Sequence, residues 1–310
     1  MAPSTSIALL FLLFLSDSRT ATGCNFPDFM QTNAEDGTKR DWRTHLTEGG
    51  RTGKNWEVAL GFYGNNMRSS VFGVMEAKDK PHPFTRICLD EVKEGRFMVE
   101  HQEHGPTTSD EYGTSLLYLC MEFVHRSDDV VQIRESRKLV FNNPNLCSQE
   151  DIEHVPWIIV NMANFYTSKV QCPLQGGFSM KVFDKIKNED ICSGYDGATR
   201  LESECMSGEG MFFRFRHEIC IPANLHMRTH QRVYCMANWQ QNGYTFSIIR
   251  ADKAEHVWCY RFPTNNHGTF QSYLFRDGRC EIDDFPQKTD RYLRIAVIHD
   301  KPRTLSDLCM

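Results

Sequence analysis

The sequence lacks the signatures of the common catalytic and nucleotide-binding sites. It contains no Walker A loop, no glycine-rich dinucleotide fingerprint and no Gly-x-Ser-x-Gly nucleophile elbow. It also has no Cys-x-x-Cys pair, and closely spaced cysteines are the usual basis of structural zinc cages. These absences favour a non-enzymatic protein that needs no metal or other cofactor. An uncatalogued hydrolase is the weakest alternative.

The chain also lacks an excess of positive charge. Its 35 Lys and Arg residues face 40 Asp and Glu residues, which gives a formal net charge of −5. Because nucleic-acid binders carry a basic patch, the overall charge argues against a nucleic-acid partner. Beyond the N-terminal segment, no run of about 18 apolar residues predicts a membrane-spanning helix. No Asn-x-Ser/Thr acceptor for N-linked glycans occurs either.

The first 23 residues have the pattern of a secretory signal peptide. An apolar core runs over residues 7–15, which is too short to span a bilayer, and a polar stretch follows it. Small residues at Ala21 and Gly23 suit cleavage just before Cys24, and a cut a few residues earlier fits the pattern equally well. We therefore expect a secreted, extracellular protein from which residues 1–23 have been removed.

All cysteines of the chain follow this segment. An even number of cysteines in a secreted chain predicts a disulfide framework. We expect six structural disulfides, whose connectivity the sequence does not determine. The twelve residues are Cys24, Cys88, Cys120, Cys147, Cys172, Cys192, Cys205, Cys220, Cys235, Cys259, Cys280 and Cys309.

The runs between the cysteines are typical of β-strands. Apolar or alternating segments such as 178–183, 211–215 and 244–249 are too short for helices. Asn242-Gly243 predicts a tight hairpin, because both residues tolerate positive φ. The sequence therefore predicts a mainly β protein of two tandem, disulfide-linked antiparallel modules. Each module is either a sandwich or a lipocalin-like barrel.

We place the first module at residues 24–150, a linker at 151–171 and the second module at 172–310. The polar stretches 32–53 and 188–204 are rich in turn-forming residues and predict loops. A weak internal repeat supports two related modules. In this repeat Cys120 and Cys235 would correspond, since each precedes a polar turn and a second apolar run.

Four short motifs, taken in order, resemble an uncharacterised invertebrate family of secreted or membrane-tethered proteins with tandem Cys-rich domains of unknown function. The chain departs from this family in a long polar insertion after its opening motif and in the lack of a C-terminal anchor. The resemblance implies an extracellular location and structural disulfides, and it carries no catalytic residues. The motifs are Cys24–Pro27, Leu119–His125 with Asp129–Glu135, Cys172–Phe178, and Cys235–Trp239 with Trp258-Cys259.

One segment is a candidate ligand-binding site. Residues 211–216 alternate aromatic and arginine side chains, and on a strand Arg214 and Arg216 share one face. Arg228 and His230 would widen this face into a basic strip that binds a polyanion such as a sulfated glycan. A half-buried strand with ordinary surface arginines is the simpler alternative.

The histidines form no recognisable metal site. His226 and His230 lie four residues apart, and His101 and His104 lie three apart, but two ligands do not make a site. We expect an extracellular recognition or matrix protein whose partner is a protein or a glycan. The alternative is a carrier that holds a small apolar ligand inside a β-barrel.

Overall fold

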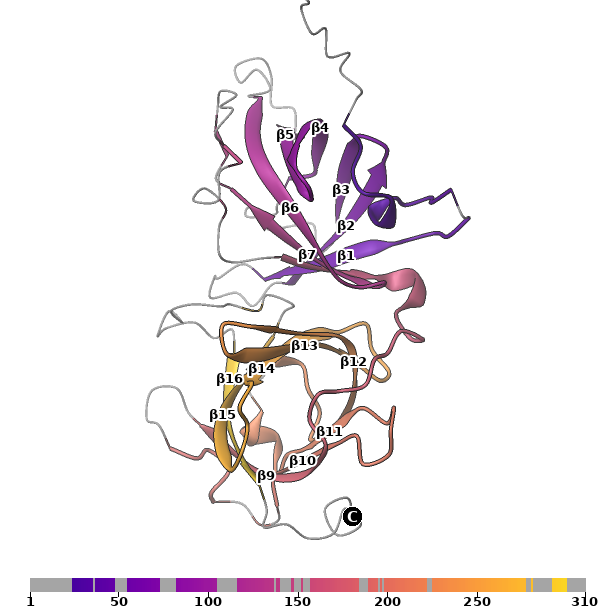
Figure 1. Ribbon diagram of the computed structural model, residues 1–310. Coiled ribbons are helices and arrows are strands. Elements are labelled where there is room, and N and C mark those ends of the chain that lie inside the picture. Colours follow the sequence, from indigo (N-terminus) through magenta and orange to yellow (C-terminus); the bar gives the residue numbers. More distant parts are fainter. Residues whose placement is uncertain are drawn as a thin grey trace, which may run out of the picture.

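The computed structural model describes most of the chain after Cys24, and the signal-peptide prediction therefore lies outside the described residues. The chain folds mainly as β-strands, joined by turns and short 3₁₀ helices. Figure 1 shows two barrels, one above the other, with the connecting segment along one side. The described residues are 24–35, 37–47, 55–72, 82–104, 116–136, 138–139, 146–147, 152, 157–183, 189–194, 196, 198–221, 225–276, 280 and 292–299.

The first barrel is a closed antiparallel meander of eight strands in sequence order. It closes where Trp42 on the first strand pairs with Asn161 on the eighth. Its strands are β1 (Trp42–Thr47), β2 (Asn55–Tyr63), β3 (Asn66–Phe72), β4 (Phe84–Lys93), β5 (Arg96–Glu103), β6 (Leu117–Ser127), β7 (Val130–Glu135) and β8 (Trp157–Asn161).

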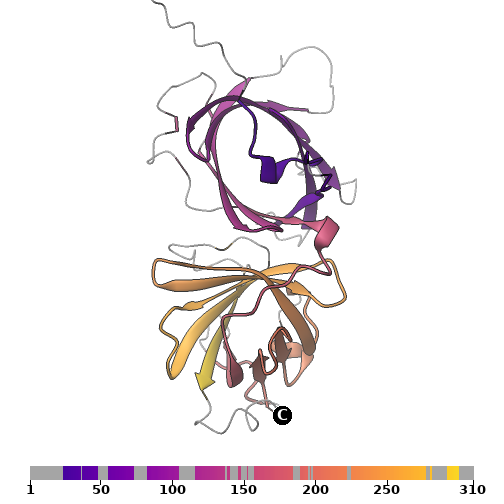
Figure 2. The ribbon, with the colours of Figure 1, turned by 45° about the vertical axis from the view of Figure 1, so that its right-hand side comes forward.

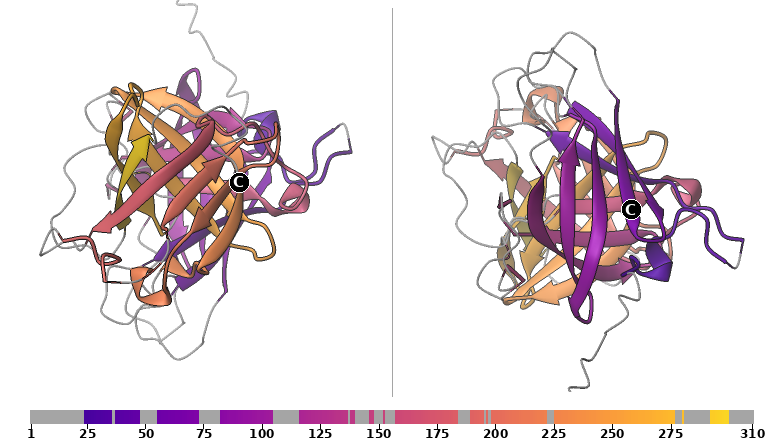
Figure 3. Two further views of the ribbon diagram at one scale, coloured as in Figure 1. Left: turned by 90° about the horizontal axis from the view of Figure 1, so that it is seen from below. Right: turned by 90° about the horizontal axis from the view of Figure 1, so that it is seen from above.

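The second barrel repeats this topology. Its first and last strands pair antiparallel, for example at Phe183 and Arg294, so this sheet also closes on itself. Figure 3 views the molecule from its two ends, with the second barrel nearer on the left and the first barrel nearer on the right. The strands are β9 (Gly176–Phe183), β10 (Arg200–Ser203), β11 (Met211–Arg214), β12 (His230–Gln241), β13 (Tyr244–Ala251), β14 (Val257–Pro263), β15 (Thr269–Phe275) and β16 (Tyr292–His299).

The mainly β prediction with two antiparallel modules is confirmed, and both modules are barrels rather than sandwiches. The predicted hairpin is also present, with Asn242 and Gly243 at φ 50° and 77° between β12 and β13. Three strands lie in segments that were expected to be loops or linker. Strand β1 lies in the loop expected at 32–53, and strand β10 lies in the loop expected at 188–204. Strand β8 falls within the expected linker and is the eighth strand of the first barrel.

Alternation of side chains fills each barrel with apolar groups. On β6, for example, Leu119 and Met121 point inward and are fully buried, as the two-residue period of a strand requires. The second barrel is filled in the same way by the buried rings of Phe213, Tyr260 and Phe262. The Tyr260 hydroxyl reaches Ser272 Oγ at 3.0 Å inside this core, where burial raises the pKa of Tyr260.

The N-terminal segment closes one end of the first barrel. It crosses the ring of strands and carries the 3₁₀ helix η1 (Asp28–Met30), as Figure 2 shows. The Phe26 ring is buried there and makes edge-to-face contacts with the rings of Phe62 and Phe123, both at 5.6 Å between centroids. The indole N–H of Trp42 donates to the Met30 carbonyl at 2.9 Å. This segment is therefore part of the barrel core.

The disulfides repeat between the barrels. Cys24–Cys88 and Cys172–Cys235 each join the segment before a barrel to its fourth strand, across sequence separations of 64 and 63 residues. Cys120–Cys147 and Cys259–Cys280 each start from the sixth strand. The counterpart of Cys235 is therefore Cys88, and that of Cys120 is Cys259. The predicted correspondence of Cys120 with Cys235 was wrong, because it compared a sixth strand with a fourth.

Three further cysteines among the described residues lie in the second barrel. Cys192 is bonded to Cys220, which lies in the 3₁₀ helix η4 (Glu218–Cys220). Cys205 is also disulfide-bonded. No free cysteine occurs among the described residues, while Cys309 lies outside them. Five disulfides are thus defined pair by pair.

The two barrels share an apolar interface. It combines side chains of β7 and β8 with side chains of β12 to β15 in one buried cluster. Phe165, just after the 3₁₀ helix η3 (Met162–Asn164), belongs to the same cluster. Arg250 holds the connecting segment by donating to the carbonyls of Tyr166 at 2.8 Å and Ser168 at 3.1 Å. The buried residues of the cluster are Val130, Ile158, Val160, Phe165, Met236, Ala237, Phe246, Ile248, Val257, Cys259, Phe275 and Cys280.

Candidate functional site

The predicted basic strip lies on the outer face of the second barrel, over β10 to β12. On β11, Met211 and Phe213 are buried inside the barrel, whereas Phe212 and Arg214 point outward. Arg214 pairs in register with His230 on β12 and with Arg200 on β10. The strand ends at Arg214, so Arg216 lies beyond it at an exposed position.

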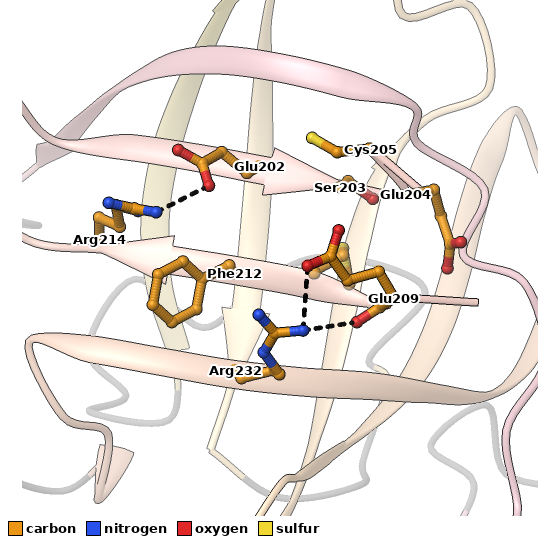
Figure 4. Close-up of a pocket in the computed structure, with 10 residues that line it drawn as sticks. Glu202, Ser203, Glu204, Cys205, Glu209, Phe212, Arg214 and Arg232 are labelled. Atoms are coloured by element: carbon orange, nitrogen blue, oxygen red, sulfur yellow. Dashed lines mark hydrogen bonds and ion pairs between the residues drawn. The ribbon is translucent and has the colours of Figure 1, made fainter. Parts of the chain in front are cut away.

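Phe212 is the centre of this face. Figure 4 shows its ring between the guanidinium groups of Arg214 and Arg232. Their carbon atoms lie 4.7 Å and 5.6 Å from the ring centroid, within the range of cation–π contacts. Arg214 also donates to Glu202 at 3.1 Å, and Arg232 donates to Glu209 at 3.2 Å. Both arginines therefore have a carboxylate partner.

A small pocket of about 160 Å³ lies beside this cluster, and three glutamates line it. Glu204 is buried with a left-handed backbone, φ 48°, and its carboxylate accepts the N–H groups of Cys172 at 2.9 Å and Gly208 at 2.6 Å. Glu202 and Glu209 hold the arginines. We call this cavity the acidic pocket. Its three carboxylates accept hydrogen bonds from groups of the protein itself.

A second pocket, of about 320 Å³, lies on the other side of the Phe212–Arg232 pair and shares both residues with the first. We call it the basic pocket. Three of the side chains that line it are permanent cations, and Asp252 is its one carboxylate. The imidazole of His256 packs on the buried indole of Trp258, with ring centroids 4.4 Å apart. The residues that line the pocket with cationic or imidazole groups are His226, Arg228, His230, Arg232, Lys253 and His256.

Two cations in the basic pocket are available to a ligand. Arg228 and Lys253 are exposed, and neither forms an ion pair within the described part of the chain. His226, which lines the same pocket, has a left-handed backbone with φ 53°. Such a conformation costs free energy for a residue with a side chain and is common at functional sites. The pocket therefore combines unpaired positive charge with a strained residue.

The structure thus brings together part of the predicted set. Arg228 and His230 line the basic pocket, and Arg214 lines the acidic pocket next to it. Arg216 lines neither pocket. Sequence reasoning missed Lys253, which the pairing of β12 with β13 brings to the same face as Arg232. No local pattern in the sequence pointed to Lys253, because only the strand pairing brings it near Arg232.

A buried charged cluster lies inside the first barrel. Arg86 forms an ion pair with Glu135, and its Nε–H donates to Nδ1 of His101 at 3.2 Å. Nε2 of the same imidazole lies 3.1 Å from Glu103 and 3.0 Å from Lys138 Nζ. The guanidinium lies 4.5 Å from the Phe84 ring centroid and 5.2 Å from that of Trp157. The Glu135 carboxylate, the His101 imidazole and these two rings surround the Arg86 guanidinium.

The pKa values of this cluster reflect its burial. Removal from water, with a smaller contribution from Arg86, lowers the pKa of His101 to about 4. A hydrogen bond from Lys138, at 2.8 Å, lowers the pKa of Glu103 to about 2. At neutral pH the cluster consequently contains a neutral imidazole between charged neighbours.

Two other sequence-based hypotheses can be compared with the described residues. No group of three or more metal-ligating side chains occurs among them, and His104 instead contacts Thr85 Oγ1 at 2.7 Å. The part of the chain that the structure describes contains no helix with the length and apolar character of a membrane crossing.

A family model described as a domain of unknown function (DUF7043) matches residues 20–159. This range contains the first barrel except for the last two residues of β8. No curated protein and no solved structure matched the chain. The matched family has no assigned function, which fits a chain that resembles an uncharacterised, Cys-rich family.

Proposed function

We propose that the protein is an extracellular recognition protein that binds an acidic group in the basic pocket of its second barrel and has no catalytic activity. The observation that carries the proposal is the pair of exposed, unpaired cations, Arg228 and Lys253, beside the imidazoles of the same pocket. Sulfate and carboxylate groups of a glycan, or acidic side chains of a partner protein, have the matching chemistry.

The neighbouring charges support this assignment. Glu209 holds Arg232 at 3.2 Å, so the shared wall of the pocket is fixed before a ligand arrives. Preorganisation of this kind reduces the entropy lost on binding. The ion pairs of the acidic pocket thereby serve as a support for the basic pocket.

The absence of catalysis in this proposal rests on the groups that line the two pockets. Ser203 carries the one hydroxyl among the side chains that line them, and it donates to the Leu174 carbonyl at 2.7 Å. Cys205 is disulfide-bonded. Neither residue is placed as an activated nucleophile.

The interiors of the barrels support recognition over the carrier alternative. In the first barrel the rings of Phe26, Phe97 and Phe123 contact one another at centroid distances of 5.5 to 6.0 Å. In the second barrel Phe213 contacts Tyr260 at 5.8 Å. Aromatic side chains occupy the positions that an apolar ligand would need.

The location rests on the disulfides. The five pairs suit an oxidising compartment, and the predicted signal peptide would direct the chain there. Secretion from cells that express the full chain, with an N-terminus at or near Cys24, tests this part of the proposal. An unprocessed chain retained in the cytosol would reject it.

The binding proposal is tested by titrating the protein with a heparin-derived tetrasaccharide and with an acidic peptide. We expect the double variant Arg228→Ala/Lys253→Ala to bind the preferred ligand at least tenfold more weakly. The control is Arg68→Ala/Lys181→Ala, which removes the same charge at two exposed positions that do not line the pocket. Equal losses in both double variants would indicate general electrostatic attraction and reject the site.

A further inference from the structure

The first barrel carries a pocket of different chemistry from that of the second. It lies where the N-terminal segment passes the turn between β2 and β3, and its volume is about 560 Å³. Its exposed polar lining consists of amides and carboxylates, and one aromatic ring adds an apolar surface. The residues that supply these groups are Asn25, Asp28, Phe29, Asn33 and Glu35.

The functional groups of this pocket match hydroxyl groups. The amides of Asn25 and Asn33 each donate and accept hydrogen bonds, and carboxylates accept them. The lining contains two carboxylates and one guanidinium, that of Arg40, so it has little net charge. A sugar hydroxyl also donates and accepts. An anion would instead suit a lining dominated by cations, as in the basic pocket.

The polar side chains of the lining have unused hydrogen-bonding capacity. In the described part of the chain, no side-chain hydrogen bond or ion pair involves Asn25, Asp28, Asn33 or Glu35. The ring of Phe29 is half-buried and is held edge-to-face against His125, with centroids 5.1 Å apart. The pocket therefore offers free polar groups next to a fixed ring.

Hydrogen bonds hold the frame of this pocket in place. The Gln31 side chain donates to the Phe26 carbonyl at 2.7 Å and accepts the Gly64 N–H at 2.8 Å. One residue later, Thr32 exchanges two hydrogen bonds with Phe62, at 2.8 and 2.9 Å. Gln31 thus ties the N-terminal segment to the β2–β3 turn.

The opposite side of the frame is held in the same way. The Arg40 N–H donates to the Thr32 carbonyl at 2.9 Å, and its guanidinium donates to the Gln31 carbonyl at 3.3 Å. The Cys24–Cys88 disulfide anchors the start of the segment to β4. These bonds fix the backbone that carries the exposed groups, which reduces the entropy lost on binding.

We propose that this pocket binds a neutral saccharide, whose hydroxyls bond to the amides and carboxylates while one sugar face packs on Phe29. This site is independent of the basic pocket. The protein would then recognise two chemically different groups, one on each barrel.

The test uses the full chain and immobilised tetrasaccharides of glucose, mannose, galactose and N-acetylglucosamine, beside sulfated and sialylated glycans. We expect wild type to retain at least one neutral tetrasaccharide. We expect Asn33→Ala and Phe29→Ala each to weaken that binding roughly tenfold. Gln240→Ala, an exposed amide on β12, is the matched control and should bind as wild type does.

Two further readouts separate this site from the basic pocket. Binding of a neutral sugar should change little between low and high salt, because no net charge is neutralised. It should also survive in Arg228→Ala/Lys253→Ala. Failure to retain any neutral tetrasaccharide would overturn the proposal, as would unchanged binding by Asn33→Ala. Retention of cationic peptides alone, lost at high salt, would assign the pocket to a basic partner and overturn it too.

Discussion

The guanidinium of Arg126 lies 4.6 Å from the ring centroid of Trp239, so a cation–π contact joins the first barrel to the second. Trp239 also stacks on Phe246, with centroids 5.3 Å apart, and Arg126 donates to Gln132 at 2.9 Å. Burial lowers the pKa of Arg126 to about 10, which leaves the group charged at neutral pH. One side chain from each barrel thus takes part in a shared, partly dehydrated contact.

This contact should couple the stabilities of the barrels. In a double-mutant cycle with Arg126→Ala and Trp239→Ala, we expect a coupling free energy of about 0.5 to 2 kcal/mol. Urea unfolding followed by tryptophan fluorescence and by circular dichroism measures it. Additive effects of the two substitutions would show that the side chains contribute independently.

The closure of the first barrel depends on Phe26. Phe26→Ala removes a fully buried ring that contacts three other phenylalanines, so we expect a loss of about 3 to 5 kcal/mol in unfolding free energy. Chemical denaturation measures this loss. Phe72→Ala is the control, because that ring is 53% exposed, and it should cost about 0.5 kcal/mol or less. Similar costs for the two variants would mean that Phe26 does not hold the barrel end closed.

The repeated disulfides predict matched energetic effects. Removing Cys24–Cys88 or Cys172–Cys235 by substitution with alanine opens loops of nearly equal length, 64 and 63 residues. Loop entropy alone predicts a loss of about 4 kcal/mol for each. For Cys259–Cys280, with a separation of 21 residues, it predicts about 3 kcal/mol. Guanidinium chloride denaturation of the three variants measures their losses in unfolding free energy and so ranks the three disulfides. The reverse order would show that local packing outweighs the entropy of the unfolded chain.

The buried cluster in the first barrel predicts acid sensitivity. His101 has a folded-state pKa of about 4, below the value of about 6.5 for an unfolded chain, so the unfolded state binds more protons between these values. Stability should therefore fall as the pH drops from about 6.5 to about 4, by up to about 3 kcal/mol. Denaturation at a series of pH values measures this slope.

His101→Gln removes the titrating group and should flatten the slope in that pH range, whatever its effect on stability at neutral pH. His267→Gln, at an exposed position, is the matched control and should keep the wild-type slope. A variant of His101 that loses stability with pH as steeply as wild type would assign the acid sensitivity to other groups.

Much of the architecture follows from local patterns in the sequence. Two-residue alternation and the Asn242-Gly243 turn are properties of neighbouring residues, so they predicted strands and one hairpin correctly. Segments with weak alternation were missed. Strand β10 has four residues, and β1 lies in a polar stretch, so pairing with neighbouring strands rather than local preference makes them strands.

The sequence by itself determined the strand-rich class, the cysteine set and the presence of arginine next to aromatic residues around Phe212. Closure into barrels and the pairing of Cys88 with Cys24 depend on contacts between residues far apart in the chain, which no local pattern encodes. The same holds for the sites. Tertiary structure paired Arg214 with Glu202 and placed Lys253 beside Arg228, because only the strand register decides which charges meet and which stay unpaired.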